Sequence, residues 1–255
     1  MPAAYDQYDY PHYWQGRNYE HQGEVIALKA FLQRIPKVTS IIDVGAGFGR
    51  HTSSYIFRAK KVVLSDPSAR LLKEAHKRLS GYKKIKYVQS TLENLPEKLR
   101  HKKFDLAIFV RVIHHIQDPH KAVGLLDKLI EPGGYLIIEF ANKIHGKEIF
   151  RNFLHGNFTY PLDIFPKDKR SDKSIEDRTI PFLNFHPDVI TEALEEKRYK
   201  IVEVRSVSNV RSSLLKRLLP YSVLVSIEGL LQRPLAFFKF GPSIFILARK
   251  PRITG

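Results

Sequence analysis

Residues 41–50, Ile-Ile-Asp-Val-Gly-Ala-Gly-Phe-Gly-Arg, place a short apolar run directly before three closely spaced glycines. Glycine reaches backbone conformations that other residues avoid, so this spacing predicts a tight turn at the end of a buried strand. A strand, a glycine-rich turn and a following helix are typical of the ligand-binding corner of a doubly wound sheet. This segment therefore constrains the fold more than any other.

Strand and helix signals alternate on both sides of the turn. Alternation at this spacing predicts a parallel, doubly wound α/β sheet that is buried on both faces. We expect strands at 40–44, 61–64, 85–89, 104–110, 135–140, 199–207 and 243–250, and helices at 24–35, 50–59, 68–79, 118–130 and 187–198.

Three segments interrupt this rhythm. Residues 1–22 form an aromatic leader, and the main domain spans 23–255. Residues 141–184 are polar and aromatic and are too long for an ordinary connection, which favours a cap or lid. Residues 212–240 predict one or two apolar helices inserted before the last strand. The Pro-Gly-Gly sequence at 132–134 is expected to break the chain before the strand at 135–140.

The composition excludes several chemistries. The chain has 255 residues and no cysteine, so it can form no disulfide, thiolate metal site or cysteine nucleophile. No apolar run reaches the roughly 18 uncharged residues of a spanning helix. The amino-terminal residues show no basic and then apolar pattern of a secretory signal. We therefore expect a soluble, cytoplasmic protein.

The net charge of +16 lies at the two ends of the chain. Residues 1–100 and residues 200–255 each carry +8, whereas the middle is nearly neutral. Such a field favours anionic partners, namely nucleic acid, an anionic membrane surface or phosphorylated small molecules. A basic surface that serves only solubility is an equal alternative.

The glycine turn departs from the dinucleotide-binding fingerprint. Arg50 stands where that fingerprint needs glycine or alanine, and Asp43 precedes the first glycine by two residues. A carboxylate at Asp43 would repel a pyrophosphate but attract an ammonium group. In these residues the chain resembles the class I S-adenosylmethionine-dependent methyltransferases, and the likeness runs in order from about residue 41 to residue 140.

The resemblance implies how the cofactor, S-adenosyl-L-methionine, is held. The acid and glycine turn would hold its methionine end, and Asp66 after the second strand would take both ribose hydroxyls. Thr91 stands where many relatives have an aspartate for the adenine, while Leu92 offers its backbone N–H. The resemblance also implies a seven-stranded Rossmann-like sheet whose last strand is antiparallel. The implied cofactor-binding residues are Arg17, Asp43, Gly45, Ala46, Gly47, Gly49, Asp66, Pro67, Thr91, Leu92, Val110 and Arg111.

The residues after the fourth strand, Val110-Arg111-Val112, lack the motif of enzymes that methylate exocyclic base amines. What remains resembles the small-molecule branch of the family, including enzymes of quinone biosynthesis. Methyl transfer needs alignment of the acceptor more than a dedicated base, so no catalytic residue is assigned. His114 is a candidate base and His115 a weaker one, although both more often cap such a junction. No third ligand is spaced to make them a metal site.

The leader is rich in aromatic residues. We expect it to fold over the cofactor, with Arg17 pairing with the methionine carboxylate; a disordered leader is the alternative. Residues 212–240 are expected to pack a cap or form a dimer face, with a lipid or membrane contact as the alternative. The tyrosines and tryptophan of the leader lie at Tyr5, Tyr8, Tyr10, Tyr13, Trp14 and Tyr19.

Sequence reasoning leaves four functions open. The first is methyl transfer to a small, partly apolar or lipid-like acceptor at O, N or C. The second is an RNA methyltransferase that uses the basic ends as a phosphate track. The third is a protein that binds the cofactor without catalysis. The fourth, a nicotinamide oxidoreductase, is disfavoured by Asp43 and Arg50.

Overall fold

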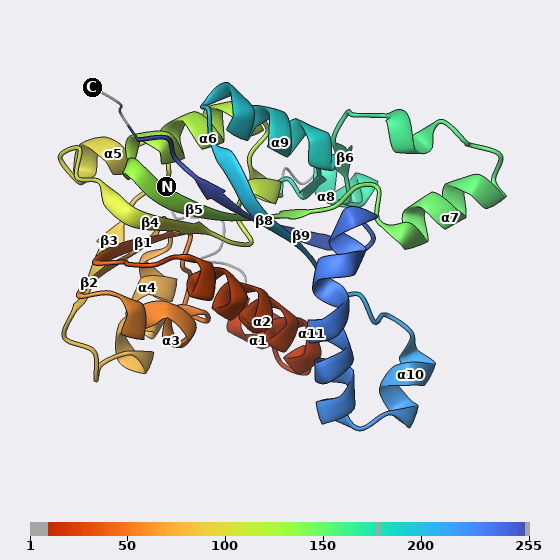
Figure 1. Cartoon of the computed structure of the whole chain (residues 1–255), viewed down its shortest axis with the longest axis horizontal. Coiled ribbons are helices and arrows are strands. Elements are labelled where there is room, and N and C mark those ends of the chain that lie inside the picture. Colours follow the sequence, from red (N-terminus) through yellow and green to blue (C-terminus); the bar gives the residue numbers. More distant parts are fainter. Residues whose placement is uncertain (1–9, 177–178, 253–255) are drawn as a thin grey trace.

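A computed structural model describes residues 10–176 and 179–252, so Tyr5 and Tyr8 of the predicted leader lie outside the described residues. Its centre is a seven-stranded sheet with the strand order β3-β2-β1-β4-β5-β9-β8 (Figure 1). The strands are β1 (Ser40–Val44), β2 (Lys61–Asp66), β3 (Ile85–Gln89), β4 (Phe104–Phe109), β5 (Ile130–Ala141), β8 (Lys200–Val207) and β9 (Ser243–Arg249).

Pairing within the sheet is parallel from β3 to β5. Strand β9, the last along the chain, runs antiparallel to both β5 and β8. The predicted fold class is therefore confirmed: a Rossmann-like, doubly wound, seven-stranded sheet whose last strand is antiparallel.

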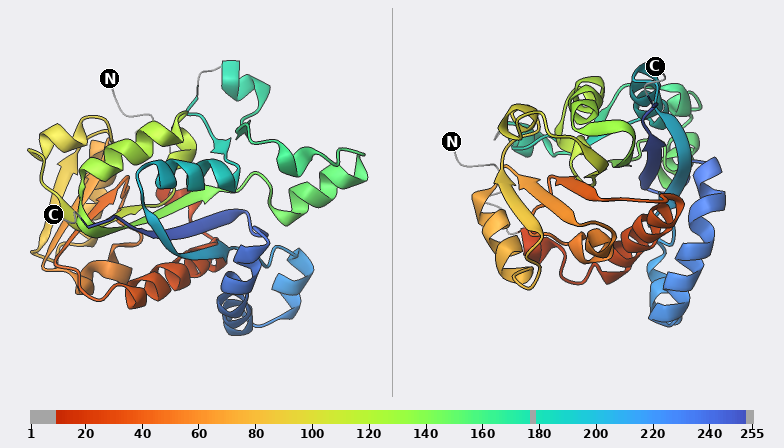
Figure 2. Two further views of the ribbon diagram at one scale, coloured as in Figure 1. Left: turned by 45° about the horizontal axis from the view of Figure 1, so that its top comes forward. Right: turned by 60° about the vertical axis from the view of Figure 1, so that its left-hand side comes forward.

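Helices cover both faces of the sheet (Figure 2, right). One layer lies above the sheet in Figure 1 and the other lies below it. The upper layer holds α5 (Leu95–Lys98), α6 (Pro119–Lys128) and α9 (Pro187–Glu196). The lower layer holds α2 (Asn18–Arg34), α3 (Thr52–Tyr55), the short 3-10 helix η2 (Ile56–Arg58) and α4 (Ala69–Arg78).

Alternate residues of the strands pack into two separate apolar cores, one on each face of the sheet. On β1, Ile42 belongs to the core under α6 and α9, while its neighbour Ile41 belongs to the core over α2 and α4. On β4, Phe109 and Ile108 divide between the two cores in the same way. Because successive side chains of a strand point to opposite faces, an apolar run without alternation is what a sheet covered on both faces requires.

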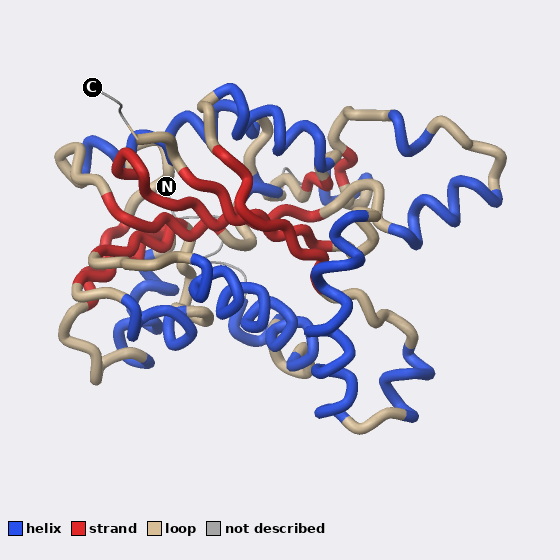
Figure 3. The backbone as a smooth tube through the Cα atoms, in the orientation of Figure 1, coloured by secondary structure: helices blue, strands red, loops and turns tan. Residues whose placement is uncertain are grey.

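The segment 141–184, which we call the lid, extends away from the end of the sheet where β5 finishes (Figure 1). It contains α7 (Gly146–Leu154), the 3-10 helix η4 (Tyr160–Leu162), α8 (Asp172–Glu176) and a two-stranded ribbon of β6 (Lys167–Asp168) and β7 (Leu183–Asn184). Much of it is loop, as Figure 3 shows in tan.

The segment 212–240 forms two helices, α10 (Ser213–Leu218) and α11 (Tyr221–Phe237). Helix α11 packs on α2 and β8. Its buried Glu228 accepts hydrogen bonds from the backbone N–H groups of Ser208 at 2.8 Å and Asn209 at 2.9 Å. Gln232, one turn further on, donates to the backbone oxygen of Gly23 at 2.7 Å. In the described part of the chain, no helix is both long and apolar enough to cross a bilayer.

Three predicted boundaries are wrong. Helix α2 begins at Asn18, so residues 18–22 of the predicted leader are helical. The helix expected at 50–59 is two short pieces, α3 and η2, which meet at Tyr55, where φ is −130° and departs from the helical value. The break expected at residues 132–134 does not occur. Strand β5 continues through Gly133 and Gly134, and its register against β4 shifts there instead.

Candidate active site

The glycine turn follows β1 and is fastened to the end of β2. The backbone N–H groups of Gly45 and Ala46 donate to the carbonyl of Ser65 at 2.7 and 2.9 Å. Gly45 has a φ of +75°, and a Cβ there would lie 2.2 Å from a methyl carbon of Val112. Only glycine combines that backbone conformation with that contact, so the turn stays close to the edge of the sheet.

Two carboxylates flank this turn. Asp43 is buried and accepts a 2.5 Å hydrogen bond from the Tyr55 hydroxyl. Burial raises the pKa of Asp43 to about 7, against the opposing effect of the Tyr55 hydrogen bond. Asp66, at the end of β2, accepts from the backbone N–H groups of Gly47 and Ser68, each at 2.8 Å. The structure thus brings both predicted acids to the same turn.

The carboxyl ends of β3 and β4 reach the same edge of the sheet. After β3, Thr91 is exposed and Leu92 is buried in the upper core. After β4, Arg111 adopts a φ of +63°, and its backbone N–H donates to the buried Glu139 of β5 at 2.8 Å. Ligands of open α/β sheets bind outside the carboxyl ends of the strands, which is where these residues lie.

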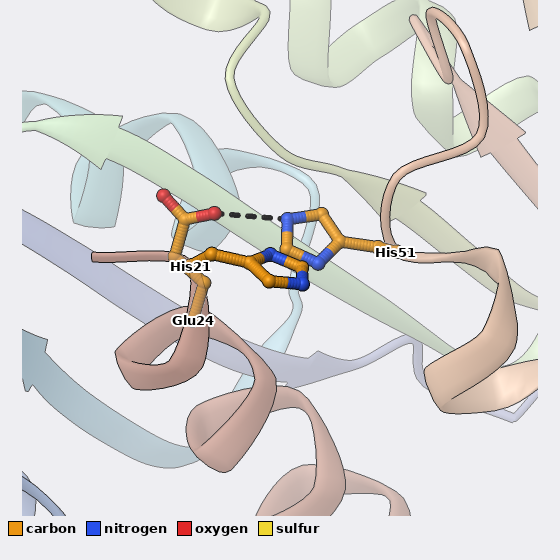
Figure 4. A group of neighbouring side chains, drawn as sticks. All are labelled: His21, Glu24 and His51. Carbon is orange, nitrogen blue, oxygen red and sulfur yellow. Dashed lines mark hydrogen bonds and ion pairs between the residues drawn. The ribbon is translucent and has the colours of Figure 1, made fainter. Parts of the chain in front are cut away.

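A buried glutamate of α2 joins these elements. Glu24 has no exposed surface, and it pairs with Arg50 at 2.5 Å and with Arg111 at 2.7 Å. His51 lies 2.9 Å from the same carboxylate (Figure 4). Burial opposes ionisation, yet the guanidinium groups of Arg111 and Arg50 hold the pKa of Glu24 well below its usual range. Arg50, which follows the glycine turn, and Arg111, two residues beyond β4, are therefore held by the same carboxylate.

His21, Glu24 and His51 also have ligand atoms close enough together to suit a metal ion (Figure 4). The guanidinium group of Arg50 already lies 2.6 Å from Nδ1 of His21 and 2.5 Å from the Glu24 carboxylate. Burial and the charge of Arg50 lower the pKa of His51 to about 3, so that ring is neutral. The guanidinium group of Arg50 thus already supplies the positive charge among these side chains. We interpret the cluster as a group of buried ion pairs.

The short helix α1 (Tyr10–Tyr13) and the residue after it cover the glycine turn. The ring of Tyr10 lies 3.6 Å from where a Cβ on Gly47 would be. The ring of Trp14 stacks on the Arg50 guanidinium at 3.4 Å from the ring centroid. Arg17 stacks on Tyr13 at 4.1 Å. The described part of the leader therefore lies over the turn and brings Arg17 toward the same edge.

A pocket of about 540 Å³ opens beside this edge. It lies within the usual range of about 300–1,000 Å³ for small-molecule sites. Arg111 lines its wall toward the glycine turn, and lid residues such as His145 and Phe182 line the far side. The remaining wall comes from the leader, the ends of β5 and β8, the start of β9, and α10. The pocket therefore lies between the lid and the edge that carries the predicted site residues.

A family model described as a methyltransferase domain matches residues 42–138. These residues run from within β1 into β5 and contain both acids of the turn. The chain is a class I S-adenosylmethionine-dependent methyltransferase. S-Adenosyl-L-methionine is its cofactor.

The methyltransferase is 25% identical to the tRNA 5-carboxymethoxyuridine methyltransferase of Escherichia coli, over 85% of this chain and 82% of that one. It is 31% identical to the mitochondrial ubiquinone biosynthesis O-methyltransferase of Dictyostelium discoideum, over 52% of this chain and 47% of that one. The second likeness therefore spans about half of either protein.

Solved methyltransferases share the fold. An N-methyltransferase of Bradyrhizobium japonicum in complex with S-adenosyl-L-homocysteine has a TM-score of 0.56 and 14% identity, over 90% of this chain and 86% of that one. An S-adenosylmethionine-dependent methyltransferase of Mesorhizobium loti also has a TM-score of 0.56, with 18% identity over 88% and 96% of the two chains.

The residues of the methyltransferase fit its cofactor. Asp43 is a buried carboxylate, and among residues 10–176 and 179–252 no Lys, Arg or His nitrogen lies within 4 Å of it. An ammonium group is the partner that such a carboxylate lacks. The two oxygens of Asp66 accept the backbone N–H groups of Gly47 and Ser68, and a carboxylate at the end of β2 is the kind of acceptor that suits a pair of ribose hydroxyls.

The two candidate histidines sit behind the pocket. His114 is buried, its ring centroid lies 4.5 Å from that of Phe182, and its Nδ1 has no hydrogen-bond partner among the described residues. Burial lowers the pKa of His114 well below its usual value, so the ring is neutral at pH 7. His115 lies 2.7 Å from the carbonyl of Pro181 through Nδ1. His115 thus ties the β4 exit to the lid.

Sequence reasoning missed Glu24, and it placed His145 in or beside the cap with lining of the pocket and simple exposure as equal alternatives. The signal for Glu24 was present, because it falls on the apolar stripe of α2 with Leu28, Phe31 and Ile35 at helical spacing. An acid at such a position is buried and needs partners. His145 gave no such signal, because only the folded lid brings it into the pocket wall.

Proposed function

We propose that the methyltransferase transfers a methyl group to a small, partly apolar acceptor, at O, N or C, bound in the pocket under the lid. The main support for this proposal is the pocket. At Arg111 it reaches the edge of the sheet where the predicted cofactor-binding residues lie. Tyr13 of the leader and Phe182 of the lid supply aromatic surface to its wall. The likeness to ubiquinone biosynthesis O-methyltransferases supports an acceptor of this kind.

The chain's own residues hold and align the reactants in this proposal. The cofactor supplies an activated methyl group on a sulfonium sulfur. The glycine turn and Asp43 hold its methionine end, Asp66 its ribose, and the β3 exit its adenine. The proposed contacts are Arg17, Asp43, Gly45, Ala46, Gly47, Gly49, Asp66, Pro67, Thr91, Leu92, Val110 and Arg111. The leader and the lid exclude water from the pocket, and we propose that the protein acts in the cytoplasm.

Incubation with methyl-tritiated S-adenosylmethionine and a cell extract tests the proposal. We expect label that survives ribonuclease and moves to organic-solvent or small-molecule fractions. An Asp66→Asn sample, in which the ribose contact is weakened, is the control for transfer that depends on this site. Label that ribonuclease releases from precipitable material would contradict a small acceptor.

A second candidate is methylation of a nucleotide in RNA. It is favoured by the basic ends of the chain and by the likeness to the tRNA 5-carboxymethoxyuridine methyltransferase, which covers 82% of that protein. Many phosphate contacts make binding fall steeply with salt. Activity that drops by a factor of about 10³ or more between 50 and 200 mM salt would favour RNA over a small acceptor.

A further inference from the structure

The wall of the pocket is strongly cationic. Among the described residues that line it, seven are lysine or arginine and two, Glu20 and Glu148, are acidic. Glu148 pairs with Lys167 at 3.0 Å and with Lys169 at 3.4 Å. Glu20 pairs with Lys216 at 2.8 Å. The two acids are therefore already engaged, and the wall keeps an excess of positive charge.

Three of these cations have no carboxylate partner among the residues that the structure describes. In the described part of the chain no Asp or Glu oxygen lies within 4 Å of the charged groups of Arg17, Lys147 or Arg211. Lys147 belongs to α7 of the lid, and Arg211 lies between β8 and α10. Side chains from segments far apart in the sequence thus carry unneutralised charge into one pocket, which attracts an anion.

Two buried polar atoms of the wall, one on Asn184 and one on Ser208, also have no partner in the described part of the chain. Asn184 is 6% exposed and Ser208 is 7% exposed. The Oδ1 atom of Asn184 and the Oγ atom of Ser208 have no hydrogen-bond partner among the described residues. A buried hydroxyl or amide without a partner is unfavourable, so such groups in a pocket wall indicate a polar ligand. The Ser208 hydroxyl can donate to an oxyanion.

The pKa of His145 depends on the electrostatic potential of this wall. It is buried, and it lies among Arg211, Glu148, Lys169 and Lys147. Burial and then the charge of Arg211 lower the pKa of His145 to about 4. At pH 7 the ring is neutral and adds no charge, and an anion beside Arg211 would raise its pKa.

We propose that the acceptor carries an oxyanion, a carboxylate or a phosphate, that binds the cationic wall formed by Lys147, Lys169 and Arg211 beside Ser208. This inference rests on the proposed function for the statement that the pocket holds the acceptor. The arginine guanidinium presents a planar fork that suits both groups. The anion orients the acceptor from the lid side, while its reacting atom faces Arg111 and the cofactor edge.

Calorimetric titration of the full chain, saturated with S-adenosylhomocysteine, tests this inference. The probes are benzoate, phenyl phosphate and neutral benzamide, which share a ring and differ in the oxyanion. We expect at least one anion to bind about tenfold or more tightly than benzamide, as one charged hydrogen-bonded contact supplies. The tighter of the two anions identifies the group as carboxylate or phosphate. Equal affinity for all three probes would overturn the inference.

Substitution distinguishes anion binding at the cationic wall from attraction by positive charge elsewhere on the protein. Arg211→Gln is expected to remove the tenfold preference, whereas Arg233→Gln, an exposed arginine of α11 outside the pocket, is expected to retain it. S-Adenosylhomocysteine affinity should stay unchanged in both variants, which shows that both fold. An Arg211→Gln protein that keeps the preference would refute the assignment.

The ring resonances of His145 give a second readout that does not depend on methyl transfer. We expect the preferred anion to raise the pKa of His145 from about 4, and benzamide to leave it there. Failure of the proposed function would be seen in a different experiment, the tritium-transfer assay, as label that ribonuclease releases from precipitable material. If an oligoribonucleotide displaces phenyl phosphate and also takes the label, the oxyanion belongs to RNA and the small-acceptor form of the inference is wrong.

Discussion

Glu24→Gln should destabilise the fold far more than its single lost charge suggests. Glu24 is fully buried and pairs with Arg50 and Arg111, whose side chains are 7% and 20% exposed. Removing one partner of a buried ion pair costs about 3–5 kcal/mol, because the other charge is left buried. Arg111 keeps some contact with solvent, so we expect a loss of about 3 kcal/mol in the free energy of unfolding.

The assay is thermal unfolding followed by circular dichroism, supported by urea titration. A loss of about 1 kcal/mol lowers the Tm of a chain of about 150–250 residues by about 2–4 °C, so we expect a fall of about 6–12 °C. Glu74→Gln is the matched control. Its 2.9 Å pair with Arg70 is solvent-exposed, and its loss should lower the unfolding free energy by about 0.5 kcal/mol or less.

The pH dependence checks the cause. The pKa of Glu24 in the folded state lies well below its ordinary value of 4.5, so its stabilisation is present above pH 4.5 and is lost as pH falls toward the folded-state pKa. The Tm difference between the wild type and Glu24→Gln should therefore shrink below pH 4.5. A Glu24→Gln variant with the Tm of Glu74→Gln at pH 7 would refute the reasoning.

Three further predictions follow from the cofactor edge. Arg17→Ala should weaken S-adenosylmethionine binding by about tenfold if that side chain pairs with the methionine carboxylate; unchanged affinity in calorimetry would reject the role. Because the pKa of Asp43 is raised to about 7, ionised Asp43 becomes more abundant as pH rises, and cofactor affinity should increase from pH 6 to pH 8. Asp43→Asn should show no such rise, and a rise that persists there would assign it to another group. Gly45→Ala should lower the unfolding free energy by about 2 kcal/mol or more, from a φ of +75° and a 2.2 Å approach to Val112. Val112→Ala should recover part of that loss in urea titration, and no recovery would show that backbone strain alone is responsible.

The order of elements was readable from the sequence because each strand and helix carries its own local signal. Strand β1 and strand β3 begin and end at the residues predicted for them, 40–44 and 85–89. Helix α6 begins at the Asp118-Pro119 cap, where the side chain of Asp118 accepts from the backbone of Lys121 at 3.0 Å. Such signals depend on a few neighbouring residues, so they survive without knowledge of the tertiary structure.

Other boundaries depend on distant partners. Strand β5 passes through Gly133 and Gly134 because a neighbouring strand, β4, continues to pair with it beyond the shift in register. Helix α2 begins six residues earlier than its apolar pattern, and its added turn is held from another segment, since Lys216 of α10 pairs with Glu20 at 2.8 Å. Such distant partners cannot be inferred from the residues that neighbour each boundary in the sequence.

The sequence by itself determined the glycine turn, the two acids beside it and the family that such a turn implies, because motif, strand and turn are contiguous in the chain. The pocket was decided only by the tertiary structure. Lys147, Lys169 and Arg211 are spread over 65 positions. The first two lie in the middle of the chain, which is nearly neutral when its charges are counted along the sequence, and Arg211 lies in the basic segment 200–255. Folding places these cations around His145, where the Glu148 carboxylate is shared between Lys167 and Lys169, so the charge of the pocket is a property of three-dimensional proximity and not of local composition.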